Sequence, residues 1–137
     1  MGKDKVYRNF IVEQLTDLSS EEYQRHEWIE DPKHSWYFPD EIMCRWFDDA
    51  SLGERDISLV DLTPEELVIL QPISIVLKKF YEQYKITMLP EELLHFPSWV
   101  AVRETAQQTL RKLEKAGWNT KGHYLPGYTG FIVDDVI

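Results

Sequence analysis

Features that favour a membrane protein or a disulfide-bonded protein are scarce in this chain. Its 137 residues include a single cysteine, Cys44, so no internal disulfide can form, as is typical of proteins in a reducing compartment. No apolar run approaches the roughly 20 residues that cross a bilayer. The first ten residues also lack the apolar core of a signal peptide. We therefore expect a cytoplasmic protein without membrane contact.

Basic residues are also fewer than acidic ones. Fifteen lysines and arginines stand against 24 aspartates and glutamates, which gives a net charge of −9. A charge of this sign opposes direct binding to nucleic acid and favours a cationic partner. We expect no direct contact with nucleic acid.

Sequence signatures of catalysis and cofactor binding are missing. The chain has neither the GxxxxGK[ST] loop that binds phosphates nor a GxGxxG motif after a strand. The segment from His26 to Glu30 resembles the zinc-protease motif HExxH, but Glu30 stands where the second histidine is required. We predict no catalytic residues, no cofactor and no metal. The alternative is an enzyme or a metal- or ligand-binding protein with a site near His26, Glu30 and His34.

The hydrophobic pattern predicts a mainly α-helical fold. Hydrophobic residues make up 43% of the chain and recur at helical spacing in several segments, which is enough to form a core. We predict a single globular domain over residues 1–137, built as a bundle of six or seven helices. A short strand or hairpin is expected near the C-terminus, where residues 131–133 are apolar and glycines and a proline imply turns.

Capping residues predict where the first helices begin. A first helix is expected over residues 10–18. Ser19 precedes Glu22 by three residues, a capping-box spacing that predicts a short helix through about Trp28. Pro39 suits the first position of a further helix.

The second half of the chain has the clearest helix signals. Thr63 precedes Pro64 and is followed three residues later by Glu66, which predicts an N-cap and a capping box. Pro72 should end or kink this helix, with another running on to about residue 84. Ser98 is expected to cap the longest helix, and Gly117 to end it.

Residues 21–49 combine aromatic rings with carboxylates. This fifth of the chain holds seven aromatic residues and nine acidic ones against three basic ones, so it carries −6 of the net charge. Helix periodicity predicts that Trp28, Trp46 and Phe47 pack inward. Three consecutive loop aromatics from Trp36 to Phe38 cannot all point one way, so at least one should stay near the surface. A ring with a carboxylate rim is typical of an interface.

These features favour a non-catalytic protein that binds a basic partner. In size, acidity, missing signal peptide and lack of catalytic motifs, the whole chain resembles the small acidic immunity proteins of bacterial toxin systems. That resemblance implies a protein that neutralises a basic toxin, such as a nuclease domain, and that is a monomer alone or a heterodimer with its partner. We expect a set of carboxylates and aromatic residues in this stretch to form the partner-binding surface: Glu30, Asp31, Trp36, Tyr37, Asp40, Glu41, Asp48 and Asp49. A third possibility is a subunit of a larger assembly, with the aromatic stretch as a self-association patch.

Overall fold

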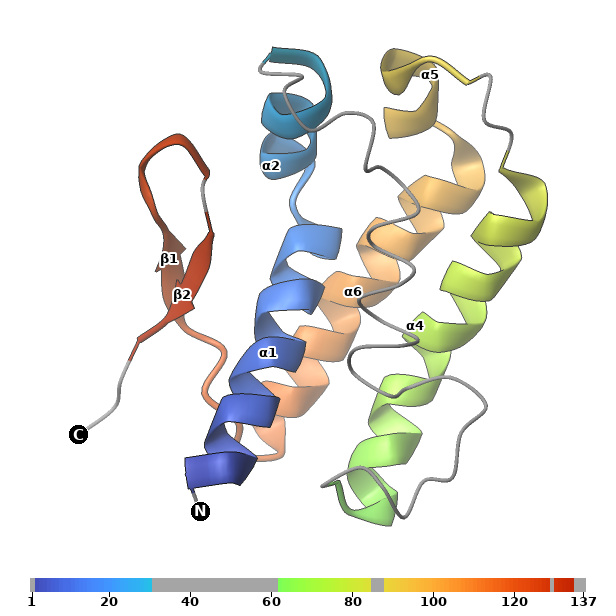
Figure 1. The fold of residues 1–137 in the computed structure, drawn as a ribbon. Coiled ribbons are helices and arrows are strands. Elements are labelled where there is room, and N and C mark those ends of the chain that lie inside the picture. The colour runs from blue at the N-terminus through green and yellow to red at the C-terminus, as the bar shows by residue number, and fades with distance from the viewer. Residues whose placement is uncertain (1, 31–61, 85–87, 129, 135–137) are drawn as a thin grey trace.

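Three long helices form the body of the protein. The computed structural model describes residues 2–30, 62–84, 88–128 and 130–134. Helices α1 (Gly2–Ser19) and α4 (Pro64–Gln83) both pack against α6 (Pro97–Lys115), which runs antiparallel to them (Figure 1). The described residues hold five α-helices and one two-stranded hairpin, so the prediction of a mainly α protein is confirmed. The predicted count of six or seven helices includes one from Pro39, which lies outside these residues.

Three short helical segments lie together at one end of the bundle. Helix α2 (Glu21–Arg25) continues directly into a π-helical turn, η1 (His26–Glu30). Both contact α5 (Pro90–Leu94), the short helix that precedes α6. Pro90 stands at the start of α5, a position that suits proline, and Glu91 and Glu92 lie in its first turn.

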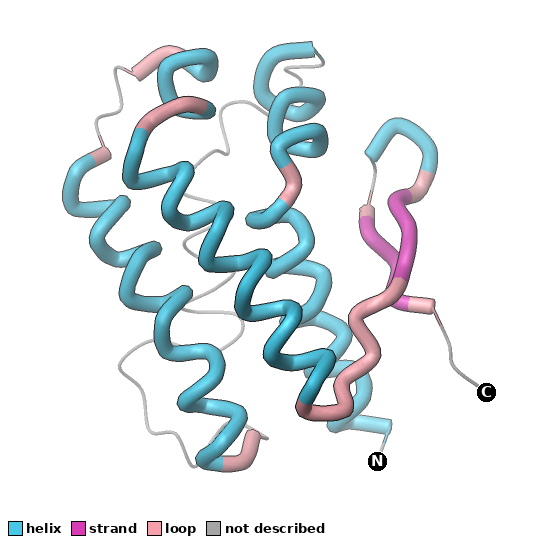
Figure 2. The backbone as a smooth tube through the Cα atoms, turned by 180° about the vertical axis from the view of Figure 1, so that it is seen from behind, coloured by secondary structure: helices cyan, strands magenta, loops and turns pink. Residues whose placement is uncertain are grey.

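The C-terminal hairpin packs on the outer side of α1. Strands β1 (Gly122–Tyr124) and β2 (Phe131–Val133) pair antiparallel, with His123 opposite Ile132 and a 3-10 turn, η5 (Pro126–Tyr128), between them. Both tube and ribbon views place the hairpin beside α1 and away from α4 (Figure 2). The predicted strand at residues 131–133 is confirmed.

Tyr124 connects this hairpin to the junction of α1 and α2. Its hydroxyl donates to Asp17 Oδ1 at 3.0 Å, and its ring stacks on Tyr23 with centroids 5.3 Å apart. Burial raises the pKa of the Tyr124 hydroxyl above its ordinary value, and the Asp17 carboxylate raises it further. The hydroxyl therefore stays protonated and keeps its role as a donor.

The core lies where the three long helices meet. Its buried side chains come from α1 (Ile11, Val12, Leu15, Leu18), α4 (Leu70, Ile73, Leu77, Phe80) and α6 (Trp99, Val102, Ala106, Leu113). Trp99 is fully buried and contacts Phe80 and Trp28, with ring centroids at 4.9 and 5.4 Å. Trp28 is buried, as its helix position predicted. None of the helices in the described part of the chain is both long enough and apolar enough to span a membrane.

Helix α4 confirms one prediction and corrects another. The Thr63 side chain accepts a hydrogen bond from the Glu66 backbone N–H, and Glu66 accepts one from the Thr63 N–H, so the capping box is formed. The prediction was that Pro72 ends or kinks this helix, and an end there is wrong, because α4 continues through it to Gln83. Pro72 removes one backbone hydrogen bond. The buried stripe from Leu70 to Leu77 continues across it, and packing on α6 outweighs that loss.

Helix α6 begins two residues earlier than predicted, with Phe96 and not Ser98 at the N-cap position. Pro97 takes the first helical position after Phe96, whose side chain makes no capping hydrogen bond. Ser98 therefore lies inside the helix, and its hydroxyl donates to the Gln83 side chain instead. The predicted end is confirmed, since Gly117 follows the last turn with a φ of 99°, which suits glycine.

A buried carboxylate joins α4, α1 and the segment after α6. Oε2 of Glu66 accepts from Trp118 Nε1 at 2.6 Å and lies 3.1 Å from Arg8 Nη2, while Oε1 accepts the Thr63 N–H. Burial alone raises the pKa of Glu66. The hydrogen bonds from Thr63 and Trp118, together with the charge of Arg8, outweigh it, and the net pKa lies below the ordinary 4.5. Arg8 also lies 5.1 Å from the centroid of the Trp118 ring.

We predict that Glu66→Gln lowers the free energy of unfolding at pH 7 by about 1–3 kcal/mol, since an amide has one acceptor oxygen where the carboxylate uses two. The pKa of Glu66 is lower in the folded state. Its carboxylate therefore stabilises the fold above pH 4.5, and that stabilisation is lost as the pH falls through the folded-state value. Urea unfolding from pH 7 down to about pH 3 measures both effects. The difference between wild type and variant should shrink at low pH.

Glu65→Gln is the matched control for this test, because Glu65 is exposed in the same helical turn. Its unfolding free energy should stay within about 0.5 kcal/mol of the wild-type value. An equal loss in both variants, or a Glu66→Gln difference that does not change with pH, would contradict a specific role for the buried carboxylate.

Candidate functional site

One of the eight predicted binding residues lies in the described part of the chain. Glu30 is exposed and is the last residue of η1, the helical turn that follows α2. The other seven (Asp31, Trp36, Tyr37, Asp40, Glu41, Asp48 and Asp49) lie outside the described residues. The site is therefore built from the helices that position Glu30 and from their neighbours.

The helix that leads to Glu30 begins at Ser20. The Ser20 hydroxyl accepts from the Tyr23 backbone N–H at 3.0 Å, so Ser20 is the N-cap of α2. The predicted cap, Ser19, is wrong by one residue. Ser19 ends α1, and its hydroxyl donates back to the carbonyl of Thr16. Tyr23 occupies the third helical position, so the Glu22 spacing indicated the wrong cap residue.

Gln24 attaches α2 to the rest of the protein. Its side chain is fully buried, and its amide nitrogen donates to the carbonyls of Asp17 and Leu18 at 3.0 and 2.8 Å. Its oxygen accepts from Trp99 Nε1 at 2.9 Å and from Arg103 Nη1 at 3.2 Å. Both donors and both acceptor positions of the amide are used, so burial leaves no unpaired polar group here. This one side chain joins α1, α2 and α6.

Arg103 extends the same network to the surface and to α5. It is buried, donates to the Leu94 carbonyl at 3.2 Å, and pairs with Glu21 at 3.2 Å. Glu21 also lies 3.6 Å from Arg25, one helical turn away. The first turn of α2 and the last residue of α5 are thus held by the same guanidinium group.

Packing places a set of glutamates at one end of the bundle. We call this set the acidic end: Glu21, Glu22, Glu27 and Glu30 from α2 and η1, and Glu91 and Glu92 from α5. Five are exposed and Glu27 is half-buried. Two arginines, Arg25 and the buried Arg103, lie against this set, and both pair with Glu21. The acidic end therefore carries a concentrated negative charge on a rigid support.

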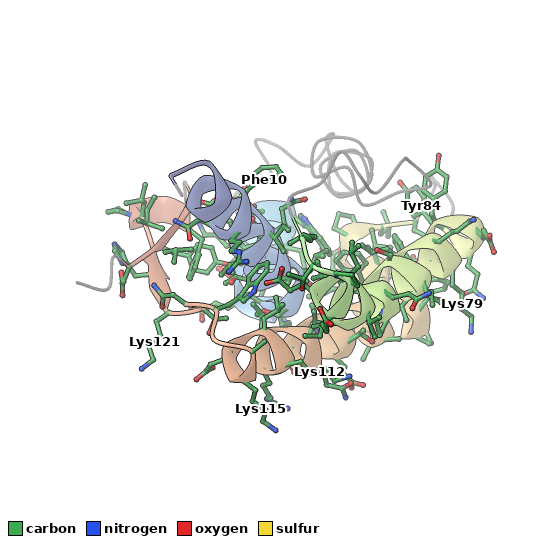
Figure 3. The ribbon with its side chains drawn as sticks, turned by 90° about the horizontal axis from the view of Figure 1, so that it is seen from below. Phe10, Lys79, Tyr84, Lys112, Lys115 and Lys121 are labelled. Atoms are coloured by element: carbon green, nitrogen blue, oxygen red, sulfur yellow. The ribbon has the colours of Figure 1, made fainter. Side chains whose placement is uncertain are left out.

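The opposite end of α6 is basic. Lys112 and Lys115 lie in its last turn and point outward, away from α1 and α4 (Figure 3). They complement the negative end of the helix dipole. Arg103, by contrast, is buried at the acidic end, so the basic residues of α6 do not form a single face.

The alternative site around His26 is described in part. Nδ1 of His26 lies 3.7 Å from Glu27 Oε1, which is too long for a hydrogen bond. In the portion of the chain that the structure describes, no three histidine, cysteine or acidic side chains are grouped so that they could hold a metal ion. His34 lies outside that portion.

Sequence reasoning missed the parts of the site that depend on tertiary contacts. Glu91 and Glu92 follow Pro90 in the first turn of α5, and nothing local indicates that α5 packs beside α2. Gln24 and Arg103 have no distinctive spacing, being 79 residues apart. One weak signal was available, since both are polar residues on the buried faces of their helices.

Comparison with known proteins found no match among protein-family models, curated proteins or solved structures.

We predict that Gln24→Met lowers the free energy of unfolding by about 2–4 kcal/mol. The substitution preserves length but removes the acceptor for the Trp99 and Arg103 donors and the donor for two carbonyls. Chemical denaturation followed by tryptophan fluorescence measures this loss, since Trp99 and Trp28 are in contact.

Gln107→Met is the matched control. Gln107 is an exposed glutamine that donates to the carbonyl of Ser19 at 3.1 Å. Water can replace that bond, so its substitution should cost no more than about 0.5 kcal/mol. A similar decrease in the free energy of unfolding for both variants would show that the buried hydrogen bonds of Gln24 contribute no more to stability than the exposed one of Gln107.

Proposed function

We propose that this protein is a non-catalytic interaction protein that binds a basic partner, as a bacterial toxin-immunity protein does. The partner class that fits best is a nuclease-type toxin domain, which must hold a polyanion in a basic cleft. The observation that supports the proposal is the acidic end, where two segments far apart in the sequence bring six glutamates together. Carboxylates grouped at one end of a protein can occupy phosphate positions in a basic cleft.

The support of these carboxylates also favours binding. A binding surface loses less entropy on association when its backbone is already fixed. Glu21 is held by Arg103 and Arg25, and the α2 backbone is held by Gln24. The acidic end is therefore preorganised, whereas carboxylates on mobile segments would have to be ordered by the partner.

Electrostatics and aromatic anchoring have separate roles in this proposal. The concentrated negative charge speeds encounter with a basic protein, an effect that salt weakens. Trp36 and Tyr37 follow Glu30 closely in the sequence, and we propose them as anchors that slow release, with Asp40 and Glu41 beside them. In this division, the acidic end sets the association rate and the rings set the dissociation rate.

Affinity capture from the source organism tests the proposal directly. The immobilised protein should retain a basic protein at about 50 mM salt and release it at about 500 mM, because screening shortens the range of charge attraction. The retained protein should cut RNA or DNA, and one equivalent of this protein should abolish that activity. Recovery of no basic protein, or binding that salt does not weaken, would reject the proposed function.

We predict that Glu30→Lys combined with Glu91→Lys weakens binding to the captured partner at least about tenfold, mainly through slower association. The matched control is Glu104→Lys with Glu114→Lys, which changes the net charge equally at exposed positions of α6. Surface plasmon resonance gives both rate constants. Equal weakening by the two pairs would show that net charge alone acts, and that the acidic end is not the binding surface.

The proposed anchors need a separate variant. Trp36→Ala and Tyr37→Ala, together with Asp40→Lys and Glu41→Lys, should abolish binding while the circular dichroism spectrum and melting temperature are unchanged. Loss of folding in this variant would show that these residues belong to the core and not to a binding surface.

A further inference from the structure

The outer side of α4 carries an exposed apolar stripe. Val68 and Ile75 are 66% and 59% exposed. They are seven residues apart, which places them about 10 Å from each other on one face of the helix. Pro72 lies half-buried between them, and Gln71 is exposed. Isolated exposed aliphatic residues are ordinary, but a pair on one face of a helix is a surface that a partner can cover.

Opposite charges flank this apolar pair. Glu65 is exposed in the first turn of α4, and Lys78 and Lys79 are exposed near its end. Figure 3 shows Lys79 pointing away from the bundle. We define the α4 stripe as Glu65, Val68, Gln71, Ile75, Lys78 and Lys79. Along the helix the order is acidic, apolar, polar, apolar, basic.

We propose that the α4 stripe binds the α4 stripe of a second copy of this chain, with the two helices antiparallel. A twofold axis between Gln71 and Pro72 places Val68 of each copy opposite Ile75 of the other. The same axis places Glu65 opposite Lys78, with Lys79 within reach of its long side chain. The stripe is therefore self-complementary in both charge and hydrophobicity, as a twofold interface requires.

Pro72 adds an acceptor at the centre of this interface. Because proline lacks an N–H, the carbonyl of Val68 has no donor four residues ahead. Gln71 lies next to the twofold axis, and its amide can donate to this carbonyl in the other copy. An irregularity that weakens the isolated helix thus becomes a contact point between copies.

The interface is small, so the dimer is weak and reversible. One face of a 20-residue helix buries less than the roughly 1,200 Å² of a standard stable interface. The interface leaves the acidic end uncovered, since that end is formed by α2, η1 and α5. The inference is independent of the proposed function, and it departs from the expectation that the protein alone is a monomer.

Sedimentation velocity from about 10 μM to about 1 mM tests whether the dimer exists. The sedimentation coefficient should rise with concentration toward that of a dimer. Ile75→Ser should abolish this rise, whereas Tyr81→Ser should not, because Tyr81 is 54% exposed but lies about 120° around the helix from Ile75. A protein that stays monomeric up to 1 mM, or a dimer that both serine variants preserve, would overturn the proposal.

Charge reversal gives a sharper test of the antiparallel register. Glu65→Lys alone, and Lys78→Glu with Lys79→Glu in a second variant, should each weaken self-association roughly tenfold, since like charges then meet at both symmetry-related positions. In a mixture of the two variants every facing pair is again of opposite sign, so a heterodimer should form at wild-type strength. If the mixture associates no better than each variant alone, the register is wrong.

Discussion

The buried amide of Gln24 is the contact on which the candidate site depends. It takes two donors from α6 and gives two hydrogen bonds to the end of α1, so the short helix α2 is held on both long helices at once. A helix of five residues has too few internal hydrogen bonds to be stable alone, and its position comes from tertiary contacts. The positions of the glutamates on α2 and η1 therefore depend on that attachment.

A hydrogen bond from a buried tryptophan to another helix also occurs at the other end of α6. Trp99, in the first turn, donates its indole N–H to Gln24, and Trp118, just beyond the last turn, donates its own to Glu66. Each tryptophan thus combines a large buried ring with one directed hydrogen bond to a different helix. Between these two points most buried side chains of α6 are apolar, and Arg103 adds hydrogen bonds at the Gln24 end. The hydrogen bonds therefore fix how far α1 and α4 are displaced along α6, which hydrophobic packing alone specifies poorly.

The predictable part of the fold is the part that local chemistry determines. The Thr63 capping box forms as its residue spacing indicated, because both of its hydrogen bonds join residues three apart. An end at Pro72 was wrongly predicted because packing of α4 on α6 outweighs the backbone hydrogen bond that proline removes. No local sequence pattern contains that packing contact. The site shows the same limit. Glu30 was identified from the chain's own acidity, whereas the contribution of Gln24 and Arg103 depends on a contact between residues 79 positions apart.

The arrangement of charge links the two surfaces. Helices α1 and α4 both run toward the acidic end, and α6 runs away from it (Figure 1). An antiparallel pair of α4 helices would therefore place the acidic ends of two copies at opposite ends of the dimer, where they repel each other least. A parallel pair would bring the two acidic ends together and would set Glu65 beside Glu65. Of the ways to cover Val68 and Ile75, the proposed antiparallel pair is the one that leaves both acidic ends open to the proposed basic partner.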